Sequence, residues 1–293
     1  MMRIALFATN FSEELEAFYL EFLGKLNYNK FDISIYEPFY RKLIEARLIN
    51  PEVRPFNNYE DIKDNTDFLF CIGGDGTMLK TISLVRDSGI PILGFNTGRL
   101  GFLSGISKDE VSEAIECLKE KKFHIEKRSL IRLNKPGNLF GENNFALNEI
   151  TIHKKDSSSM ITIQAYVDDV FLNSYWADGL IVSTPTGSTA YSMSCGGPII
   201  APDSNNFILT PIASHNLTVR PIVIPDSSVV KLKVEGRSEN FLVTLDSNNV
   251  VVSNSIELEI KKETFHISLI QLNSKSFFST IREKLMWGWD KRN

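Results

Sequence analysis

The stretch Gly73-Gly74-Asp75-Gly76-Thr77 follows an apolar run at 68–72 and precedes a helical pattern at 77–87. Glycines at a strand-to-helix turn let a phosphate approach the backbone, and the start of a helix attracts anions. Neither common phosphate motif is present, because Leu79 replaces the third glycine of Gly-x-Gly-x-x-Gly and no Gly-Lys-Ser/Thr follows. At this position the carboxylate of Asp75 would repel a phosphate. It could instead be a simple helix N-cap.

A second polar cluster spans 178–191, beginning at Asp178 and ending in a hydroxyl-rich turn into a short helical segment. Small residues and hydroxyls at a helix start suit the phosphates and sugar hydroxyls of a ligand. A structural turn in a β-rich domain is the alternative interpretation. The pair Asn148-Glu149 precedes a strand, and taken in isolation it is better explained as the end of a hairpin.

Short apolar runs alternate with helical patterns over the first 120 residues. We expect strands at 4–8, 31–36, 68–72 and 91–95, and helices at 12–26, 38–48, 77–87 and 108–122. Such alternation is typical of right-handed crossovers and a parallel sheet. The sequence therefore predicts a Rossmann-like α/β domain over 1–122.

Extended, β-branched segments dominate after residue 123. We expect strands at 131–133, 149–153, 161–167, 171–176, 180–183, 219–224, 229–234, 241–245, 255–260 and 266–272, and a short helix at 188–195. Asp168-Asp169 indicates a tight hairpin. The sequence predicts an all-β, sandwich-like domain over 123–275. The amphipathic segment 276–293, with Trp289 on its apolar side, is expected to form a helix that returns to the first domain.

Bulk composition limits the possible partners. The chain has 293 residues, a net charge of −4 and no dense basic stripe, which argues against nucleic acid or an anionic membrane as a partner. No stretch approaches the roughly 20 apolar residues of a membrane span, and the apolar run at the N-terminus is too short for a signal peptide. We expect a cytoplasmic protein.

Cysteines and histidines are widely dispersed along the chain. They are Cys71, Cys117, Cys195, His124, His153, His215 and His266, and no two of the cysteines form a Cys-x-x-Cys pair. The spacing gives no support for a zinc site, and no cage of protein ligands for any metal is evident.

Several blocks closely resemble the bacterial NAD kinase family, and together they span nearly the whole chain. They are GGDGT at 73–77, NTGRLGFL at 96–103, NE at 148–149, DGLIVSTPTGSTAYSMSCGGPI at 178–199 and REKLMW at 282–287. The GGDG motif is shared with lipid kinases and 6-phosphofructokinases, whereas TPTGSTAY is far more specific to NAD kinases.

The resemblance implies transfer of the ATP γ-phosphoryl group to the 2′-hydroxyl of the adenosine ribose of NAD, giving NADP. It also implies a requirement for Mg²⁺ or another divalent cation, NAD held between the two domains, and a homodimer or homotetramer formed through the β domain. A GGDG-type lipid kinase and a non-catalytic NAD(P)-binding regulator are the alternatives. The polar TPTGSTAY block argues against the first, and Asp75 argues against the second.

Site residues are carried over by position. The resemblance implies that Asp75 is the catalytic proton acceptor. It assigns NAD binding to Asp75, Gly76, Asn148, Glu149, Asp178, Thr186, Thr189, Ala190, Tyr191, Ser192, Met193, Ser194 and Asn248. Gly73, Gly74, Thr77 and Arg99 are the candidates for contacts with the ATP phosphates. The family usually has Asp-Gly-Gln where this chain has Asp246-Ser247-Asn248, so the contact from Asn248 is the least secure.

The proposed chemistry needs positioning more than covalent help. A carboxylate with an ordinary pKa of about 3.9 is a weak base toward a ribose hydroxyl. We therefore expect Asp75 to orient the hydroxyl and to accept its proton late in the reaction.

Overall fold

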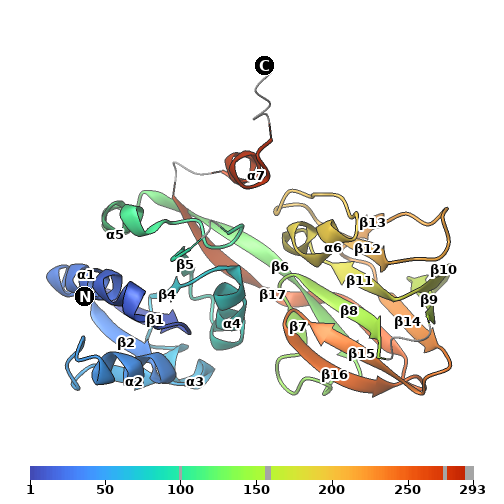
Figure 1. Cartoon of the computed structure of the whole chain (residues 1–293), viewed down its shortest axis with the longest axis horizontal. Coiled ribbons are helices and arrows are strands. Elements are labelled where there is room, and N and C mark those ends of the chain that lie inside the picture. Colours follow the sequence, from blue (N-terminus) through green and yellow to red (C-terminus); the bar gives the residue numbers. More distant parts are fainter. Residues whose placement is uncertain (99–100, 156–159, 273–275, 288–293) are drawn as a thin grey trace. The chain divides into compact units, whose positions relative to one another are not determined.

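The computed structural model describes residues 1–98, 101–155, 160–272 and 276–287. The chain forms two compact units, Met1–Lys127 with Ile267–Asn293, and Arg128–His266 (Figure 1). Both divisions fall inside strands, β6 (Phe123–Lys135) and β17 (Leu258–Leu272). A division within a strand leaves no linker composition, so the sequence pattern alone does not mark these positions.

The first unit contains a parallel sheet. In spatial order its strands are β5 (Ile92–Phe95), β4 (Phe68–Ile72), β1 (Arg3–Ala8), β2 (Asp32–Tyr36) and β3 (Arg54–Phe56). The end of β17 extends the sheet by pairing Leu269 with Ile92 of β5, also in parallel. The parallel α/β prediction for this part of the chain is confirmed.

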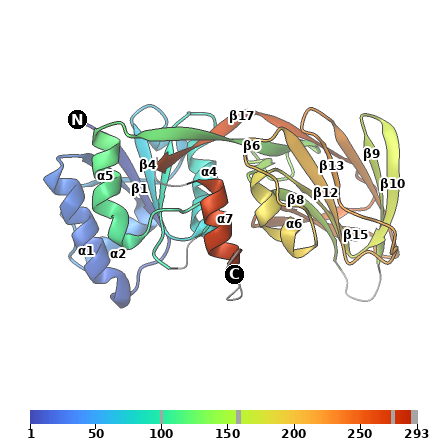
Figure 2. The same ribbon diagram turned by 90° about the horizontal axis from the view of Figure 1, so that it is seen from above.

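The first unit also contains helices. They are α1 (Glu13–Tyr28), α2 (Glu37–Glu45), α3 (Tyr59–Ile62), α4 (Asp75–Val85), α5 (Val111–Lys119) and α7 (Phe277–Leu285). The α1 and α5 helices lie side by side (Figure 2), and their apolar faces share one core with β1, β4 and β5. Phe22 of α1 packs edge-on against Phe95 of β5, with ring centroids 5.0 Å apart. This core fixes the ends of β4 and β5, where the glycine turn begins.

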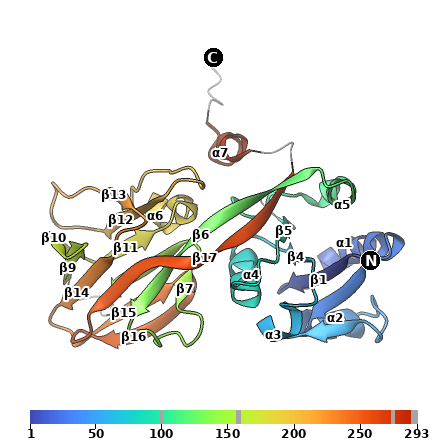
Figure 3. The same ribbon diagram turned by 180° about the vertical axis from the view of Figure 1, so that it is seen from behind.

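Two packed sheets form the second unit (Figure 3). One is antiparallel, in the order β13 (Ile222–Pro225), β12 (Asn206–Ile212), β11 (Gly179–Ser183), β8 (Glu149–Lys154), β15 (Asn240–Leu245) and β16 (Asn248–Ser253). The other contains β10 (Val170–Ala177), β9 (Ile161–Val167), β14 (Val230–Glu235) and the first part of β17, while β6 pairs with β7 (Phe145–Ala146). Side chains from both sheets fill a single apolar cluster, which confirms the predicted sandwich.

Local details agree with the sequence pattern to different degrees. Asp168 and Asp169 both have positive φ, 50° and 66°, as a tight hairpin between β9 and β10 requires.

The sequence pattern does not predict β12, because Pro211 interrupts its apolar run. The helix predicted at 188–195 is instead a 3₁₀ turn, η2 (Thr186–Thr189), followed by α6 (Tyr191–Ser194). Ala190, at φ −100° and ψ −129°, interrupts the helical path between them.

The C-terminal helix returns to the first unit, as predicted. Ile281 anchors α7, with only 4% of its surface exposed, and Ser276 caps its start. Trp289, predicted to pack on this helix, lies outside the described residues. No helix in the described ranges is long and apolar enough to cross a membrane.

Candidate active site

The Gly73–Thr77 turn joins β4 to α4. Gly74 is the N-cap of α4, and Asp75 is its first residue. Gly73 has a φ of +148°, and a Cβ on it would lie 2.5 Å from Thr77 Oγ1. Both the backbone conformation and the close approach therefore require glycine at this position.

Gly74 and Gly76 have no comparable internal reason to be glycine, because a Cβ on either would meet nothing within 4 Å. Their amides, within the described residues, donate to no acceptor, as is usual at a helix start. The amides of Gly73 and Thr77, by contrast, donate to the carbonyls of Phe95 (2.8 Å) and Gly74 (2.9 Å). Open space beside two free amides at a helix N-terminus suits an anionic ligand.

Asp75 does not cap its own helix. Its Oδ2 accepts the amide of Phe102 (2.8 Å), and its Oδ1 accepts the amides of Leu103 (3.0 Å) and Ser104 (3.2 Å). Any Cβ on Gly101 would collide with the Asp75 carboxylate, so residue 101 must be glycine. The N-cap interpretation of Asp75 is therefore wrong. A carboxylate has about four acceptor positions, and three bonds leave room for one more donor.

Two further side chains complete this turn. Ser104 Oγ donates to the carbonyl of Gly73 at 2.9 Å, which ties the 102–104 segment to the glycine turn a second time. Lys284 Nζ of α7 lies 3.7 Å from Asp75 Oδ2 and 4.5 Å from the centre of the Phe102 ring. A carboxylate, a cation and free amides thus meet at the carboxyl end of β4.

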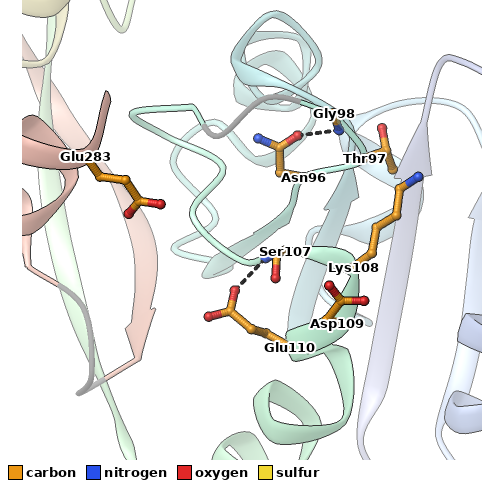
Figure 4. A pocket seen from close by; sticks show the side chains of 8 residues that line it. All are labelled: Asn96, Thr97, Gly98, Ser107, Lys108, Asp109, Glu110 and Glu283. Atoms are coloured by element: carbon orange, nitrogen blue, oxygen red, sulfur yellow. Dashed lines mark hydrogen bonds between the residues drawn. The ribbon is translucent and has the colours of Figure 1, made fainter. Parts of the chain in front are cut away.

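A cavity of about 550 Å³ lies beyond β5 (Figure 4). Its lining residues are Asn96, Thr97, Gly98, Ser107, Lys108, Asp109, Glu110 and Glu283. The lining carries three carboxylates and one lysine, which makes the cavity unfavourable for a bare phosphate. Arg99, predicted to contact ATP phosphates, lies outside the described residues. Among the described residues of this unit, the features that suit a phosphate are therefore those of the glycine turn.

The second unit repeats the arrangement seen at Asp75. Asp246, in the turn between β15 and β16, accepts the amides of Leu147 (2.8 Å), Asn148 (2.8 Å) and Glu149 (3.2 Å). Burial raises the pKa of Asp246 to about 6, and these three hydrogen bonds oppose that rise. Sequence reasoning singled out Asn248 of this turn and missed Asp246. The φ of Asp246 is positive, at 51°, and the residue type only weakly signals this backbone feature.

Glu149 is the most perturbed acid of the predicted set. It is 8% exposed, and burial, followed by the neighbouring Asp246, raises its pKa to about 8. Its Oε2 makes no hydrogen bond to any described residue. A buried carboxyl group that is neutral near pH 7 can donate a hydrogen bond as well as accept one.

The hydroxyl-rich turn packs directly on this segment. Thr184 donates from Oγ1 to the Leu147 carbonyl at 2.5 Å and from its amide to the Asn148 carbonyl at 2.9 Å. A Cβ on Gly187 would collide with that same Asn148 carbonyl. Arg128 donates to Thr186 Oγ1 at 3.3 Å. The structure therefore brings Asn148, Glu149 and Thr186 together.

The remaining predicted residues of this unit differ in their availability to a ligand. Ser192 is fully buried, and its hydroxyl pairs with that of Thr210 at 2.8 Å, whereas Tyr191 is 40% exposed. Thr189, Ala190 and Met193 are partly exposed, and Ser194 is exposed. Asp178 pairs with Lys154 at 2.5 Å. Asn248 is exposed at the first residue of β16, and its side chain makes no hydrogen bond to any described residue.

Tyr191 lies close to the acids of this unit. Burial raises the pKa of its hydroxyl, with smaller contributions from Cys195, Asp178 and Glu149. No group of three or more His, Cys, Asp or Glu side chains suited to a metal ion occurs within 1–98, 101–155, 160–272 and 276–287. The described residues therefore form no protein cage for a cation.

A parallel α/β unit with an acid inside a glycine turn, joined to a β sandwich, defines a phosphotransferase of the Gly-Gly-Asp-Gly class. Models of the ATP-NAD kinase N-terminal and C-terminal domains match residues 54–123 and 147–272. NAD kinases of Flavobacterium psychrophilum and Cytophaga hutchinsonii are 47% and 44% identical, each match covering 100% of both chains. The chain belongs to the NAD kinase family.

Solved structures show the same fold. Yeast NADH kinase complexed with NADH aligns with a TM-score of 0.84 at 23% identity, covering 99% of this chain and 89% of that one. An NAD kinase from Archaeoglobus fulgidus in complex with ATP aligns with a TM-score of 0.75 at 24% identity, covering 98% and 99%.

The glycine turn yields a prediction that separates ligand space from folding. Gly76→Ala should leave the free energy of unfolding unchanged or raise it by about 0.5–1 kcal/mol, because alanine favours a helix and no atom obstructs its methyl group. The same methyl group enters the space assigned to phosphate, so kinase activity on NAD should fall about tenfold or more. Urea unfolding and steady-state assays measure the two effects. Gly73→Ala is the comparison, because it should lose about 1–3 kcal/mol of stability. Equal activity of Gly76→Ala and wild type would exclude a ligand close to residue 76.

The raised pKa of Glu149 predicts that the stability of the protein depends on pH. Its pKa is raised on folding, so the folded state retains a proton that the unfolded state releases, and stability falls as pH rises from about 4.5 to about 8. Glu149→Gln removes this loss and should exceed wild type by about 1–3 kcal/mol at pH 8.5, with a smaller gain at pH 6.5. Denaturant titrations at the two pH values measure it. Glu239→Gln changes an exposed acid of the same unit and should show no such trend. A Glu149→Gln gain that does not grow with pH would contradict the raised pKa.

Proposed function

We propose that this chain is an NAD kinase, which transfers the γ-phosphoryl group of ATP to the 2′-hydroxyl of the adenosine ribose of NAD. One geometric observation carries the proposal. A carboxylate with one acceptor position that no described residue fills lies beside two amides that donate to no described acceptor, at a helix start. An acid matches an acceptor hydroxyl, and amides match phosphate. Family membership specifies which hydroxyl and which phosphate.

In the proposed reaction, the ribose 2′-hydroxyl donates a hydrogen bond to Asp75. The hydroxyl oxygen forms a bond to the γ-phosphorus as the bond from that phosphorus to the ADP oxygen breaks. The hydroxyl proton passes to Asp75 and then to solvent, so the products are NADP, ADP and a proton. Asp75 mainly orients the oxygen, because the transition state is loose and needs little early deprotonation. The amides of Gly74 and Gly76 bind phosphate oxygens in this scheme.

NAD binding is assigned to the second unit together with Asp75 and Gly76. The proposed residues are Asn148, Glu149, Asp178, Thr186, Thr189, Ala190, Tyr191, Ser192, Met193, Ser194 and Asn248. Glu149 has a free buried oxygen and is the best supported of them, since it can meet a ribose or amide group as donor or acceptor. Ser192 and Asn248 are the least supported, because one hydroxyl is already paired and the other residue lies in an exposed hairpin.

Three further features stay predictions from the family resemblance. Mg²⁺, the proposed ion, generally keeps several waters and binds through nucleotide phosphates with few protein ligands. A homodimer or homotetramer through the second unit and a cytoplasmic location are proposed on the same basis. Neither the lipid kinase nor the regulator has a structural observation in its favour.

A donor–acceptor matrix tests the function. ATP and polyphosphate are each combined with NAD, NADH and diacylglycerol in the presence of Mg²⁺, and phosphorylated products are separated by chromatography. We expect ATP with NAD to give NADP and diacylglycerol to give no product. Phosphorylation of diacylglycerol without NADP would favour the lipid kinase. No turnover combined with tight NAD binding would favour the regulator.

Asp75→Asn tests the assigned catalytic role. The variant should bind NAD in calorimetry within about threefold of wild type, whereas kcat should fall about 10²–10⁴-fold because the proton acceptor is lost. Ser104→Ala is the matched control, since it removes the second tie of the 102–104 segment and keeps the carboxylate. If Ser104→Ala reproduced the kcat loss, Asp75 would act only by holding the segment. Near wild-type turnover of Asp75→Asn would remove the assignment altogether.

A further inference from the structure

Lys284 is the cation nearest to Asp75 among the described residues. Its Nζ is 3.7 Å from Asp75 Oδ2, which is within ion-pair range and beyond hydrogen-bond range. The Phe102 ring holds the ammonium from another side at 4.5 Å, and the Phe102 amide donates to the same Oδ2. The Phe102 ring and the Asp75 carboxylate therefore hold the Lys284 ammonium in place.

The ammonium group retains its donors. In the described part of the chain it makes no hydrogen bond, and about a third of the Lys284 side chain is exposed. A partly exposed ion pair contributes little to stability. The α7 helix has its own anchors, the buried Ile281 and the capping Ser276. Attachment of α7 to the first unit therefore does not fully explain why a cation lies beside Asp75.

The negative charge of Asp75 explains the position of Lys284 better. The Asp75 carboxylate lies in a turn whose Gly74 and Gly76 have open space on their Cβ side, and by itself it would repel an approaching phosphate. An ammonium beside Oδ2 offsets that charge and still offers three N–H donors. Arg282, two residues earlier on α7, has an exposed side chain that makes no hydrogen bond or ion pair to the described residues. The two cations of this helix are therefore not equivalent.

We propose that Lys284 is a catalytic residue that binds a non-bridging oxygen of the transferred phosphoryl group. This inference rests on the proposed function. As the ribose oxygen bonds to phosphorus and the ADP oxygen leaves, Lys284 stabilises negative charge on the phosphoryl oxygens and exchanges no proton. Asp75 takes the hydroxyl proton. The C-terminal helix thus supplies the positive counterpart of the acidic glycine turn.

Steady-state kinetics on the full chain tests the role. Lys284→Met should lower kcat about 10²–10³-fold, as for loss of a preorganised donor, with the KM for NAD within about threefold of wild type. Lys284→Arg should recover at least about tenfold of that loss, because it restores a cation with N–H donors. Arg282→Met, the matched control on the same helix, should stay within about threefold of wild type. Melting temperatures identify any variant that fails to fold.

Two measurements distinguish a phosphoryl contact from a merely structural one. Calorimetry with the β,γ-imido analogue of ATP and with ADP should show weaker binding of the analogue to Lys284→Met and unchanged binding of ADP. Small alkylammonium ions should restore part of the activity of Lys284→Ala. A kcat of Lys284→Met above a third of wild type, or equal weakening of ADP and the analogue, would overturn the inference.

The two proposals can fail separately. If wild type makes no NADP, the proposed function fails, and comparison of the ATP analogue with ADP still reports on Lys284. If wild type makes NADP and Lys284→Met does so equally well, only the role of Lys284 fails.

Discussion

The carboxylate of Asp75 organises the first unit's site by accepting three consecutive backbone amides, those of residues 102–104. Charge-assisted bonds of this kind are stronger than neutral ones, so one side chain immobilises a loop that would otherwise be free to vary. The same bonds fix the carboxylate itself. The acid that we propose to orient the acceptor hydroxyl is thereby held by the backbone, and the loop and the acid depend on each other for position.

The second unit uses the same device with a different electrostatic result. Asp246 holds residues 147–149, and the hydroxyl-rich turn packs on that segment through Thr184 and Gly187. Bringing Glu149 close to Asp246 inside the unit places two acids where water is scarce. Their pKa values rise to about 8 and about 6, so the pair carries less charge than its composition suggests. Fewer fixed charges suit the anionic dinucleotide that we propose for this unit.

The sequence allowed the fold class to be predicted because periodicity reports directly on helices and strands. It also exposed the glycine turn and the TPTGSTAY block, whose residue types are unusual. Asp246 and the 102–104 segment stayed hidden, because backbone amides bind the carboxylates and any residue type carries an amide. Lys284 stayed hidden because it lies far along the chain from Asp75, and only the packing of α7 brings them together. Gly101 was visible as a glycine, but its reason appears only when the neighbouring carboxylate is seen.

Amide recognition by Asp75 and Asp246 sets the substitution tolerance of two short segments. Since each carboxylate contacts N–H groups only, the side chains at 102–104 and 147–149 can change chemically without loss of these ties. Proline is the exception at all six positions, because it alone has no N–H. Separate contacts constrain some of these side chains, such as the Ser104 hydroxyl on the Gly73 carbonyl and the Phe102 ring beside Lys284. The two aspartates thus hold the backbone of both segments independently of what the side chains do.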